Sequence, residues 1–396
     1  MPSSEQSPGR LSGPLSGPPL DPVAAWAASG AMALTGRRDG PPLVAAGRSA
    51  AWTQEQLSLL GLSIPGLLGE RAAYGGLGRN APWSCGGAFR ILPSADGYVG
   101  LSLARPSDLD LIPALVEATV DALADPWGTL AEWLASTTSA EAEERLRLLA
   151  LPGGAVPRTP PTDRPGVIVR ALGERRRRGD QPPLVVDLTS LWAGPLCAHL
   201  LGSHGARIVK VESRSRPDGA RRGPAAFFDL LHHGHEQLVL DFDTELDQLR
   251  RLIADADLVL EASRPRALRH LGLIAEEVVA AGTSWLSITA RGRDSDAVGF
   301  GDDVAASAGL VAEDRGRPIP AGDALADPLS GVAAAVAAAD ALDGQEARLI
   351  DVSMLHVAAE ASAGEVPEHT VRRAGSGWQV EHAGGIAAVA APRTRT

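Results

Sequence analysis

The stretch LVVDLTSLWAGPLCAHLLGSHGARIVKVES, from Leu184 to Ser213, decides the fold of this chain. Its first residues, LVVDL, form a short apolar run bounded by prolines, which is typical of a strand buried on both faces. A turn and a helix-favouring segment follow, with Pro195 suited to the first helical position. The run RIVKVE at 207–212 is rich in β-branched residues and predicts a second strand. The stretch therefore predicts a β-α-β unit.

The same alternation continues downstream. Apolar runs recur as QLVLDF at 237–242, DLVLEA at 257–262 and WLSITA at 285–290, with helical patterns from Thr244 and near 265–281. Alternating strands and helices predict an α/β fold built on a doubly wound, Rossmann-like parallel sheet. In such sheets ligands bind near the carboxyl ends of the strands.

The region before Leu184 has a different character. Residues 1–20 are rich in Ser, Pro and Gly and predict a disordered tail. Residues 21–156 predict a smaller α+β domain, with a hairpin over 87–104 that turns at 95–97. The Pro- and Arg-rich segment 157–183 indicates a linker, so that the Rossmann-like domain covers 184–396.

Composition excludes several classes of function. The 396 residues carry 37 Lys and Arg against 48 Asp and Glu, which gives 37 − 48 = −11, and an acidic chain of this kind is not expected to bind nucleic acid or anionic membranes. The longest Ala-rich run, at 331–339, is too short to cross a bilayer. Two cysteines cannot form a disulfide framework, so we expect a soluble protein of the cytoplasm.

Two segments far apart in the chain are alike. DPVAAWAASGAMALTGRRDGPPLVAAG at 21–47 and DVAASAGLVAEDRGRPIPAG at 303–322 both run from an Ala- and Ser-rich helix through a turn into a Pro-bounded apolar stretch. A partial duplication explains the likeness, and chance similarity between Ala-rich helices is the alternative.

Two aspartates are the leading catalytic candidates. Asp323 and Asp327 lie where a loop meets an Ala-rich helix. Asp327 precedes a proline, so it is either the N-cap of that helix or a nucleophile, since carboxylates form covalent acyl intermediates. His232, His233 and His235 lack the further ligands that zinc requires, so we expect no metal site. The first β-α turn lacks G-x-G-x-x-G, which argues against a dinucleotide.

Read together, these stretches resemble the family III CoA-transferases, the group of formyl-CoA transferase and carnitine CoA-transferase. The resemblance is strongest over Val185 to Ser213 and continues in the order of that family over about 185 residues, through the segments 223–242, 257–273, 285–292, 302–310, 326–331 and 349–358. Residues 75–115 resemble the smaller domain of the family, but they precede the sheet instead of following it.

The resemblance implies a mechanism and a site. It implies an acyl-CoA:carboxylate CoA-transferase in which Asp327 is the nucleophile and forms first a mixed anhydride and then an aspartyl-CoA thioester. It implies that coenzyme A is a substrate, with no permanently bound cofactor, and that it lies over the first β-α turn. The residues that it assigns to coenzyme A are Trp192, Ala193, Gly194, Arg214 and Arg264. The partners that it implies are an acyl-CoA, a carboxylic acid acceptor and a second copy of the chain in a homodimer.

Three features leave alternatives open. The rearranged order and the pair His235 and Glu236, where the family carries a Lys-Arg pair, also suit a non-catalytic CoA-binding homologue or partner subunit. A racemase or isomerase of acyl-CoA is a further alternative, but the position of its histidine reads Gly301, Asp302 and Asp303. The Gly-rich run 74–78 is either a loop that closes the site or an ordinary connector.

Overall fold

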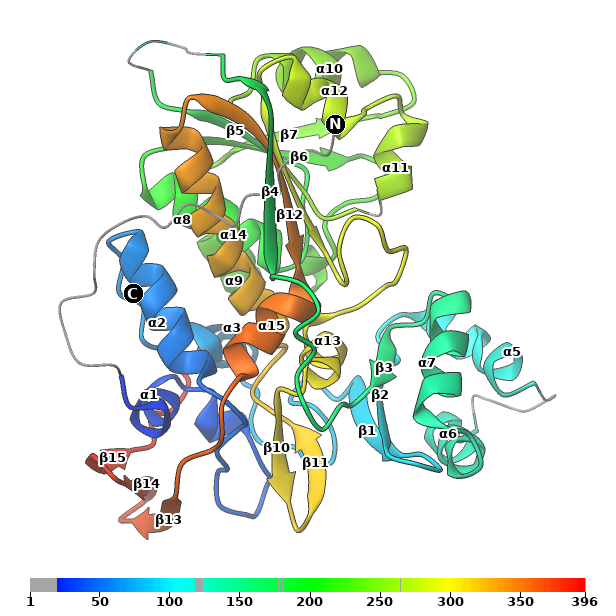
Figure 1. Ribbon diagram of the computed structural model, residues 1–396, viewed down its shortest axis with the longest axis vertical. Helices are drawn as coiled ribbons and strands as arrows, with labels where there is room; N and C mark the ends of the chain where they lie inside the picture. Colours follow the sequence, from blue (N-terminus) through cyan, green and yellow to red (C-terminus); the bar gives the residue numbers. More distant parts are fainter. Residues whose placement is uncertain (1–19, 118–123, 177–178, 180, 264, 396) are drawn as a thin grey trace.

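The computed structural model describes residues 20–117, 124–176, 179, 181–263 and 265–395. Residues 1–19 of the predicted tail lie outside these ranges. A seven-stranded sheet dominates the structure, in the order β4-β12-β9-β8-β5-β6-β7 (Figure 1). Its strands are β4 (Val167–Glu174), β5 (Leu184–Asp187), β6 (Arg207–Ser213), β7 (Glu236–Leu240), β8 (Leu258–Glu261), β9 (Ser284–Thr289) and β12 (Glu346–Ser353). All neighbours are parallel except β4, which runs antiparallel to β12 at one edge.

Helices cover both faces of this sheet because successive side chains of each strand point to opposite faces. Val185 of β5 packs on the face covered by α8 (Ala193–Ser203) and α14 (Ala326–Asp343). Its neighbours Leu184 and Val186 pack on the face covered by α10 (Leu246–Ala254) and α12 (Ala275–Ala280). The predicted doubly wound fold is confirmed, and the five strands predicted from apolar runs all form.

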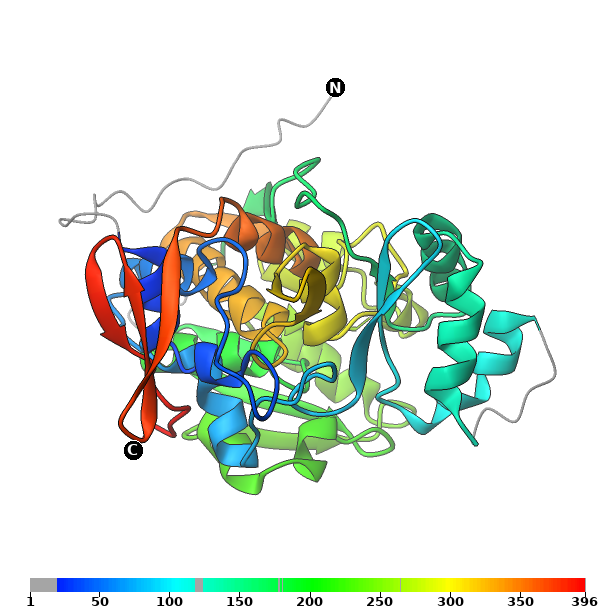
Figure 2. The ribbon, with the colours of Figure 1, turned by 90° about the horizontal axis from the view of Figure 1, so that it is seen from below.

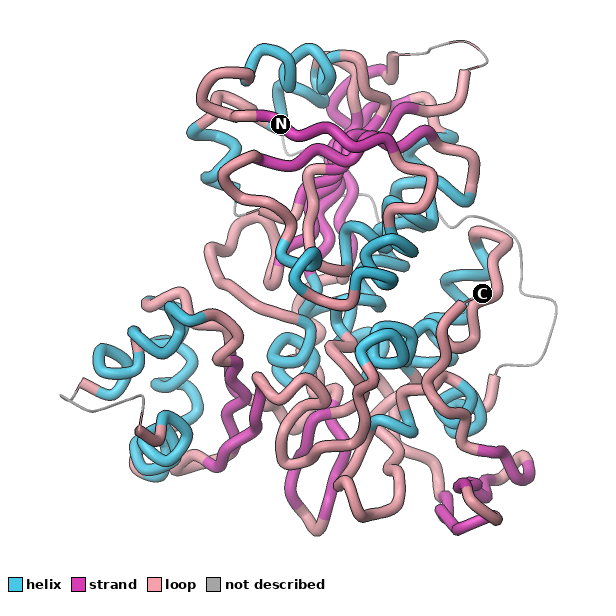
Figure 3. Tube along the Cα trace, turned by 180° about the vertical axis from the view of Figure 1, so that it is seen from behind, coloured by secondary structure: helices cyan, strands magenta, loops and turns pink. Residues whose placement is uncertain are grey.

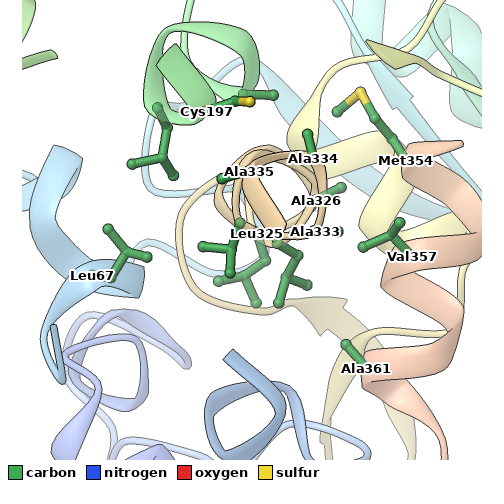
Figure 4. Close-up of a cluster of buried hydrophobic side chains, with 14 of the residues drawn as sticks. Leu67, Cys197, Leu325, Ala326, Ala333, Ala334, Ala335, Met354, Val357 and Ala361 are labelled. Carbon is green, nitrogen blue, oxygen red and sulfur yellow. The ribbon is translucent and has the colours of Figure 1, made fainter. Parts of the chain in front are cut away.

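Helix α14 lies at the centre of the larger core (Figure 4). Eight of its 18 residues are alanines, so neighbouring elements approach its backbone closely. It is surrounded by Cys197 of α8, by Met354 and Val357 of α15 (Met354–Ser362) and by Leu67 from the N-terminal part. A helix buried on nearly all sides is held rigidly by its packing, which suits it to carry a catalytic side chain.

The predicted smaller α+β unit also forms. The hairpin of β1 (Phe89–Pro93) and β2 (Tyr98–Ser102) gains β3 (Gly153–Ala155) as a third strand. Leu130, Leu134 and Leu146 of its helices are fully buried in a separate core. Figure 2 shows this unit at one end of the molecule. Its helices are α4 (Pro106–Asp110), α5 (Ile112–Val116), α6 (Pro126–Ala135) and α7 (Ser139–Leu148).

The structure differs from the predicted division at two places. The presumed linker 157–183 contains β4, whose short apolar start VIV is followed by largely exposed residues and lies between Pro- and Arg-rich stretches. The segment before residue 76 does not join the smaller unit, because α1 (Pro22–Ala28) and α2 (Ser49–Leu59) bury Trp26 and Leu57 in the larger core. The helix α3 (Glu70–Gly75) follows them.

The remaining elements complete the chain. The hairpin β10 (Val311–Asp314) and β11 (Arg317–Pro320) lies between α13 (Gly301–Ser307) and α14. A C-terminal three-stranded sheet packs beside α1, and Figure 3 shows it well separated from the main sheet. Its strands are β13 (His369–Ala374), β14 (Gly377–His382) and β15 (Gly385–Ala388). Elsewhere in the chain lie the helices α9 (Ala225–Leu231) and α11 (Pro265–His270). Short 3-10 turns are found at Met32–Leu34, Leu67–Gly69 and Gly219–Arg222.

Candidate active site

A pocket of about 450 Å³ opens at the carboxyl ends of the parallel strands. The chain runs from β5 outward to β6 and β7, then crosses to β8 on the other side of β5. The turns after β5 and β8 therefore diverge and leave a crevice, which is the usual ligand position in such sheets. Its walls come from the turn after β5, the loop after β8, the end of β9 and the first residue of α15; they include Ser190, Leu191, Ala193, Gly194, Ala262, Ser263, Ile288, Thr289, Ala290 and Met354.

Asp327 lines this pocket from the first turn of α14. The helix begins at Ala326 with Leu325 as its N-cap, so the alternative that Asp327 is the N-cap is wrong. Asp327 and Gly331 lie four residues apart and share one face of the helix. A Cβ on Gly331 would lie 2.6 Å from the carbonyl oxygen of Ala193, so α14 and α8 touch at this point. The D-x-x-x-G spacing thus places the carboxylate beside the turn after β5.

The backbone of Gly301 closes on the same carboxylate. A Cβ at this position would lie 2.4 Å from Asp327 Oδ2 and 2.3 Å from the carbonyl oxygen of Ala324. Only glycine permits so close an approach. The amide of Gly301 faces the carboxylate as a hydrogen-bond donor. The start of α13 therefore holds Asp327 in one orientation.

Asp302 and Asp323 act on the Asp327 carboxylate, and Asp303 is coupled in turn to Asp302. Asp302 Oδ1 accepts a hydrogen bond of 2.8 Å from the amide of Ala324, and Asp303 Oδ1 accepts one of 2.8 Å from Ser102 Oγ. Asp323 is fully buried beside them. Burial raises the pKa of Asp302 to about 6 and that of Asp303 to about 7. A charged carboxylate loses its hydration shell on burial, which favours the protonated form.

The pKa of Asp327 is raised to about 7, mainly by burial. The charge of Arg71 and the amide of Gly301 act against this rise, whereas Asp302 and Asp323 add to it. A carboxyl group that titrates near neutral pH in a pocket is a typical feature of a catalytic site. Asp327 thus lines the pocket, is held in one orientation and has a pKa near neutral pH.

Arg71 of α3 is a member of the cluster that the sequence analysis missed. Its Nε donates a hydrogen bond of 3.0 Å to Asp323 Oδ2, and a second guanidinium nitrogen bonds Asp323 Oδ1. The guanidinium also lies 5.3 Å from the ring centre of Trp192. Arg71 and Asp323 are 252 positions apart, and no local pattern in the sequence links them.

The predicted coenzyme A residues are distributed unevenly. Ala193 and Gly194 line the pocket, whereas Trp192 is buried behind the turn and packs edge-on against Phe227. Arg214 does not line the pocket; its side chain is exposed and lies 3.3 Å from Glu245 Oε2. Arg264 lies outside the described residues.

Two other arginines line the pocket instead. Arg216 follows β6 two residues after Arg214, and Arg105 comes from the smaller unit. Arg105 is held by Asp108 Oδ1 at 2.8 Å from its Nε, and by the carbonyl oxygen of Ala150. The assignment of Arg214 to coenzyme A stays a prediction, and the turn after β6 places Arg216 and not Arg214 in the lining of this pocket.

The Gly-rich run 74–78 takes no part in the Asp327 pocket. Gly75 ends α3 and Gly76 caps it in the left-handed region. Gly76, Leu77 and Gly78 line a separate hollow with Cys85. In the described structure this run is a helix end and connector.

A buried lysine supports the turn after β5. Lys210 of β6 is the single lysine of the sequence and is fully buried. Its Nζ donates to the carbonyl oxygen of Thr189 and lies 3.1 Å from Asp218 Oδ2. Asp218 Oδ1 in turn accepts a hydrogen bond of 2.9 Å from the amide of Leu191, whose φ is +71°. These bonds hold the turn in a conformation that non-glycine residues rarely adopt.

The family model described as CoA-transferase family III matches residues 183–394. This match covers more than half of the chain and includes every strand of the main sheet except β4, together with Asp327 and the turn after β5, so the chain belongs to CoA-transferase family III. The family predicted from the sequence is therefore confirmed.

Individual relatives show similar levels of likeness. The chain is 27% identical to a succinyl-CoA–D-citramalate CoA-transferase of Chloroflexus aurantiacus over 47% of this chain and 51% of that protein. It is 30% identical to a succinate–glutarate CoA-transferase of Agrobacterium fabrum over 45% of this chain and 52% of that protein. The chain spans about half the length of these curated relatives. A solved structure of a CaiB/BaiF family protein from Brucella suis has a TM-score of 0.46 at 23% identity, covering 52% of this chain and 66% of that chain.

Within the described ranges, no helix has both the length and the apolar character needed to span a bilayer.

Proposed function

We propose that this chain is an acyl-CoA:carboxylate CoA-transferase that works through a covalent intermediate on Asp327. The observation that carries the proposal is that the Asp327 carboxylate and the turn after β5 line one pocket. Both curated relatives described above bear names of CoA-transferases, which supports the same class of reaction.

The first half of the reaction releases the donor acid. An Asp327 oxygen attacks the thioester carbonyl of the acyl-CoA, the C–S bond breaks, and CoA leaves as a thiolate. The product on the enzyme is a mixed anhydride of Asp327 and the acyl group. The thiolate then attacks the aspartyl carbonyl carbon, and the donor acid leaves as a carboxylate. Asp327 now carries CoA as a thioester.

The second half repeats these steps in the reverse sense. The acceptor carboxylate attacks the aspartyl carbonyl and displaces the CoA thiolate, which forms a second mixed anhydride. The thiolate attacks the acyl carbonyl of the acceptor, so the new acyl-CoA departs and Asp327 is restored. Each step conserves the free energy of the thioester, provided that the pocket excludes water, which would otherwise hydrolyse the anhydride and thioester intermediates. The close packing of Gly301 and Ala324 around the carboxylate serves this exclusion.

Coenzyme A is a substrate in this scheme. We assign its thioester end to the turn of Ala193 and Gly194, with Trp192 supporting that turn from behind. Arg216 and Arg105 replace Arg214 as the pocket cations, because arginine donates paired hydrogen bonds to phosphate or carboxylate oxygens. Arg214 is exposed and pairs with Glu245.

Trapping the intermediate tests the proposal. The protein is incubated with succinyl-CoA and then with hydroxylamine, which converts an activated aspartyl group into a hydroxamate. We expect mass spectrometry to find this modification on the peptide with Asp327, and to find none in Asp327→Ala. Asp343→Ala is the matched control, since Asp343 is exposed at the other end of the same helix. Wild-type protein that shows no adduct with any of a panel of acyl-CoA donors, but binds coenzyme A in calorimetry, would support the non-catalytic alternative instead.

The assembly and location of the protein are part of the proposal. We infer a homodimer in the cytoplasm, as the family resemblance implies, with the smaller unit and the Rossmann-like part as its two domains. Sedimentation equilibrium of the purified chain measures the assembly. A single species at the monomer mass of 40.9 kDa over the micromolar range would contradict the dimer.

A further inference from the structure

The neighbouring carboxyl groups disfavour the ionised form of Asp327, which is the form that can act as a nucleophile. Asp302 and Asp323 both act on Asp327, and Asp302 also acts on Asp303, so each ionised carboxylate opposes the ionisation of its neighbour. Burial acts in the same direction. A protonated carboxyl group is a poor nucleophile, so a nearby positive charge is needed for the reaction proposed above.

Arg71 supplies that charge from outside the part of the chain that matches the family. Its guanidinium makes two hydrogen bonds with Asp323, and its charge interacts with Asp302 and Asp327 as well. The other groups that face the cluster are Arg105 and Arg216 across the pocket and the thiol of Cys85. Burial raises the pKa of that thiol, so it stays neutral and adds no charge at neutral pH.

The position of Arg71 is fixed on both sides. The face of Trp192 lies under the guanidinium, and Trp192 is itself buried against Phe227. The preceding residue, Glu70, is buried and bonds Arg395 through both carboxylate oxygens, at 2.5 and 2.8 Å. Helix α3 therefore cannot shift freely, and the guanidinium remains beside Asp323. An arginine held in this way is a preorganised charge.

We propose that Arg71 is a positioning residue for the transferase reaction, because its guanidinium, held between Asp323 and Trp192, keeps Asp327 ionised. This proposal rests on the proposed function of Asp327. It assigns a reaction role to the N-terminal part of the chain. Arg71 does not touch the substrate and acts through the charge of the cluster.

Opposite substitutions distinguish this role from a structural one. Arg71→Met removes the cation and leaves the carboxylates, so Asp327 should ionise at higher pH. Asp323→Asn removes an anion and leaves Arg71 free to pair with the remaining carboxylates, so Asp327 should ionise at lower pH. Loss of a purely structural contact would lower the reaction rate of both variants in the same way. It would not move the midpoint pH at which Asp327 ionises.

The experiment follows the pH dependence of adduct formation on Asp327 with succinyl-CoA. In Arg71→Met we expect the midpoint of the acidic limb to rise by at least one pH unit, with the rate recovering at high pH. Arg71→Lys should restore part of the shift, since it keeps the charge and loses the paired hydrogen bonds. Arg37→Met is the matched control, because Arg37 pairs with Asp314 at the surface and should leave the midpoint unchanged.

A second readout does not need activity. Carbon-13 chemical shifts of labelled aspartate side chains report the titration of Asp327, which is assigned by its loss in Asp327→Asn. The midpoint should rise in Arg71→Met and fall in Asp323→Asn. Unchanged midpoints, or shifts of the same sign in both variants, would overturn the role of Arg71. A wild-type protein that forms no adduct overturns the proposed function instead, and the titration then still decides whether Arg71 sets the charge of Asp327. Should Arg71→Met not fold, Arg71→Lys and Asp323→Asn carry the same test.

Discussion

The segment of α1 and α2 and the segment of α13 and α14 share one design but differ at the catalytic position. Each begins with a seven-residue helix, α1 or α13, followed two residues later by a glycine with positive φ, Gly30 at +80° and Gly309 at +78°. Each has another such glycine in the last turn before its next α-helix, Gly47 at +74° and Gly322 at +60°. These shared backbone features support a partial duplication over chance similarity.

The two segments also pack against each other. Helix α2 lies beside α14 in the larger core, and Ala45 forms an antiparallel bridge with Ala312. Five residues after this later glycine stands Asp327 in one segment and Trp52 in the other. The position of Gly301, at the start of α13, corresponds to Pro22 at the start of α1. The shared backbone is therefore not sufficient for a site, which requires the acid and the glycine that closes on it.

The largest expected effect concerns Asp327 itself. Asp327→Asn removes the nucleophile, and we expect CoA transfer to fall by about 1,000-fold or more, equivalent to roughly 4 kcal/mol of the activation barrier. Exchange of labelled coenzyme A measures the effect, with Asp343→Asn as the control on the same helix. Retention of more than a tenth of the wild-type rate by Asp327→Asn would remove Asp327 from the mechanism.

Trp52 should affect stability alone. It is 8% exposed and belongs to the larger core, so Trp52→Ala should lower the free energy of unfolding by about 3 kcal/mol through the cavity that it leaves. Urea denaturation measures this loss. The rate of adduct formation per folded molecule should remain that of the wild type; a loss of rate in folded protein would show that the first segment retains a catalytic role at this position.

Asp303 should make stability depend on pH, unlike Ala24 at the corresponding place in α1. Its pKa is raised by burial to about 7, so the folded state binds a proton more tightly than the unfolded state. Stability from this group is fully present below the ordinary aspartate pKa and is lost as the pH rises toward 7. Between pH 4 and pH 7 the wild type should lose about 3 kcal/mol relative to Asp303→Asn. Parallel stability curves for the two proteins would contradict the burial of an ionisable group there.

Gly301 should give the smallest effect. A methyl group at this position meets Asp327 Oδ2 and the carbonyl group of Ala324, so Gly301→Ala must displace both the carboxylate and the backbone at Ala324. We expect the rate of adduct formation to fall by about tenfold, or roughly 1.4 kcal/mol. Gly86→Ala is the control, since a Cβ there meets no atom within 4 Å. Equal rates in both variants would show that the approach of α13 does not orient Asp327.

The sequence predicted the features that depend on local patterns. Buried parallel strands appear as continuous apolar runs, so LVVDL and RIVKVE predicted β5 and β6. The residues around Asp327 left an N-cap and a nucleophile both open, and only the family resemblance assigned it as the nucleophile. Strand β4 was missed because its apolar run is only three residues long and is flanked by Pro- and Arg-rich stretches that indicated a linker. Arg71 and Arg105 were missed because each meets the site through tertiary contacts across more than a hundred residues. Helix starts were misplaced by one or two residues: Pro195 is the third residue of α8, not the first.

The burial of Lys210 has a consequence for the chemistry of the protein surface. Acyl-CoA thioesters react with free amines as well as with thiols, and a lysine exposed to such compounds becomes acylated over time. Here the one lysine side chain is enclosed between Asp187 and Asp218, and arginine carries every other cationic side chain apart from the histidines. Guanidinium groups stay protonated and do not attack thioesters at neutral pH. The folded chain therefore presents no lysine that reactive acyl donors can damage.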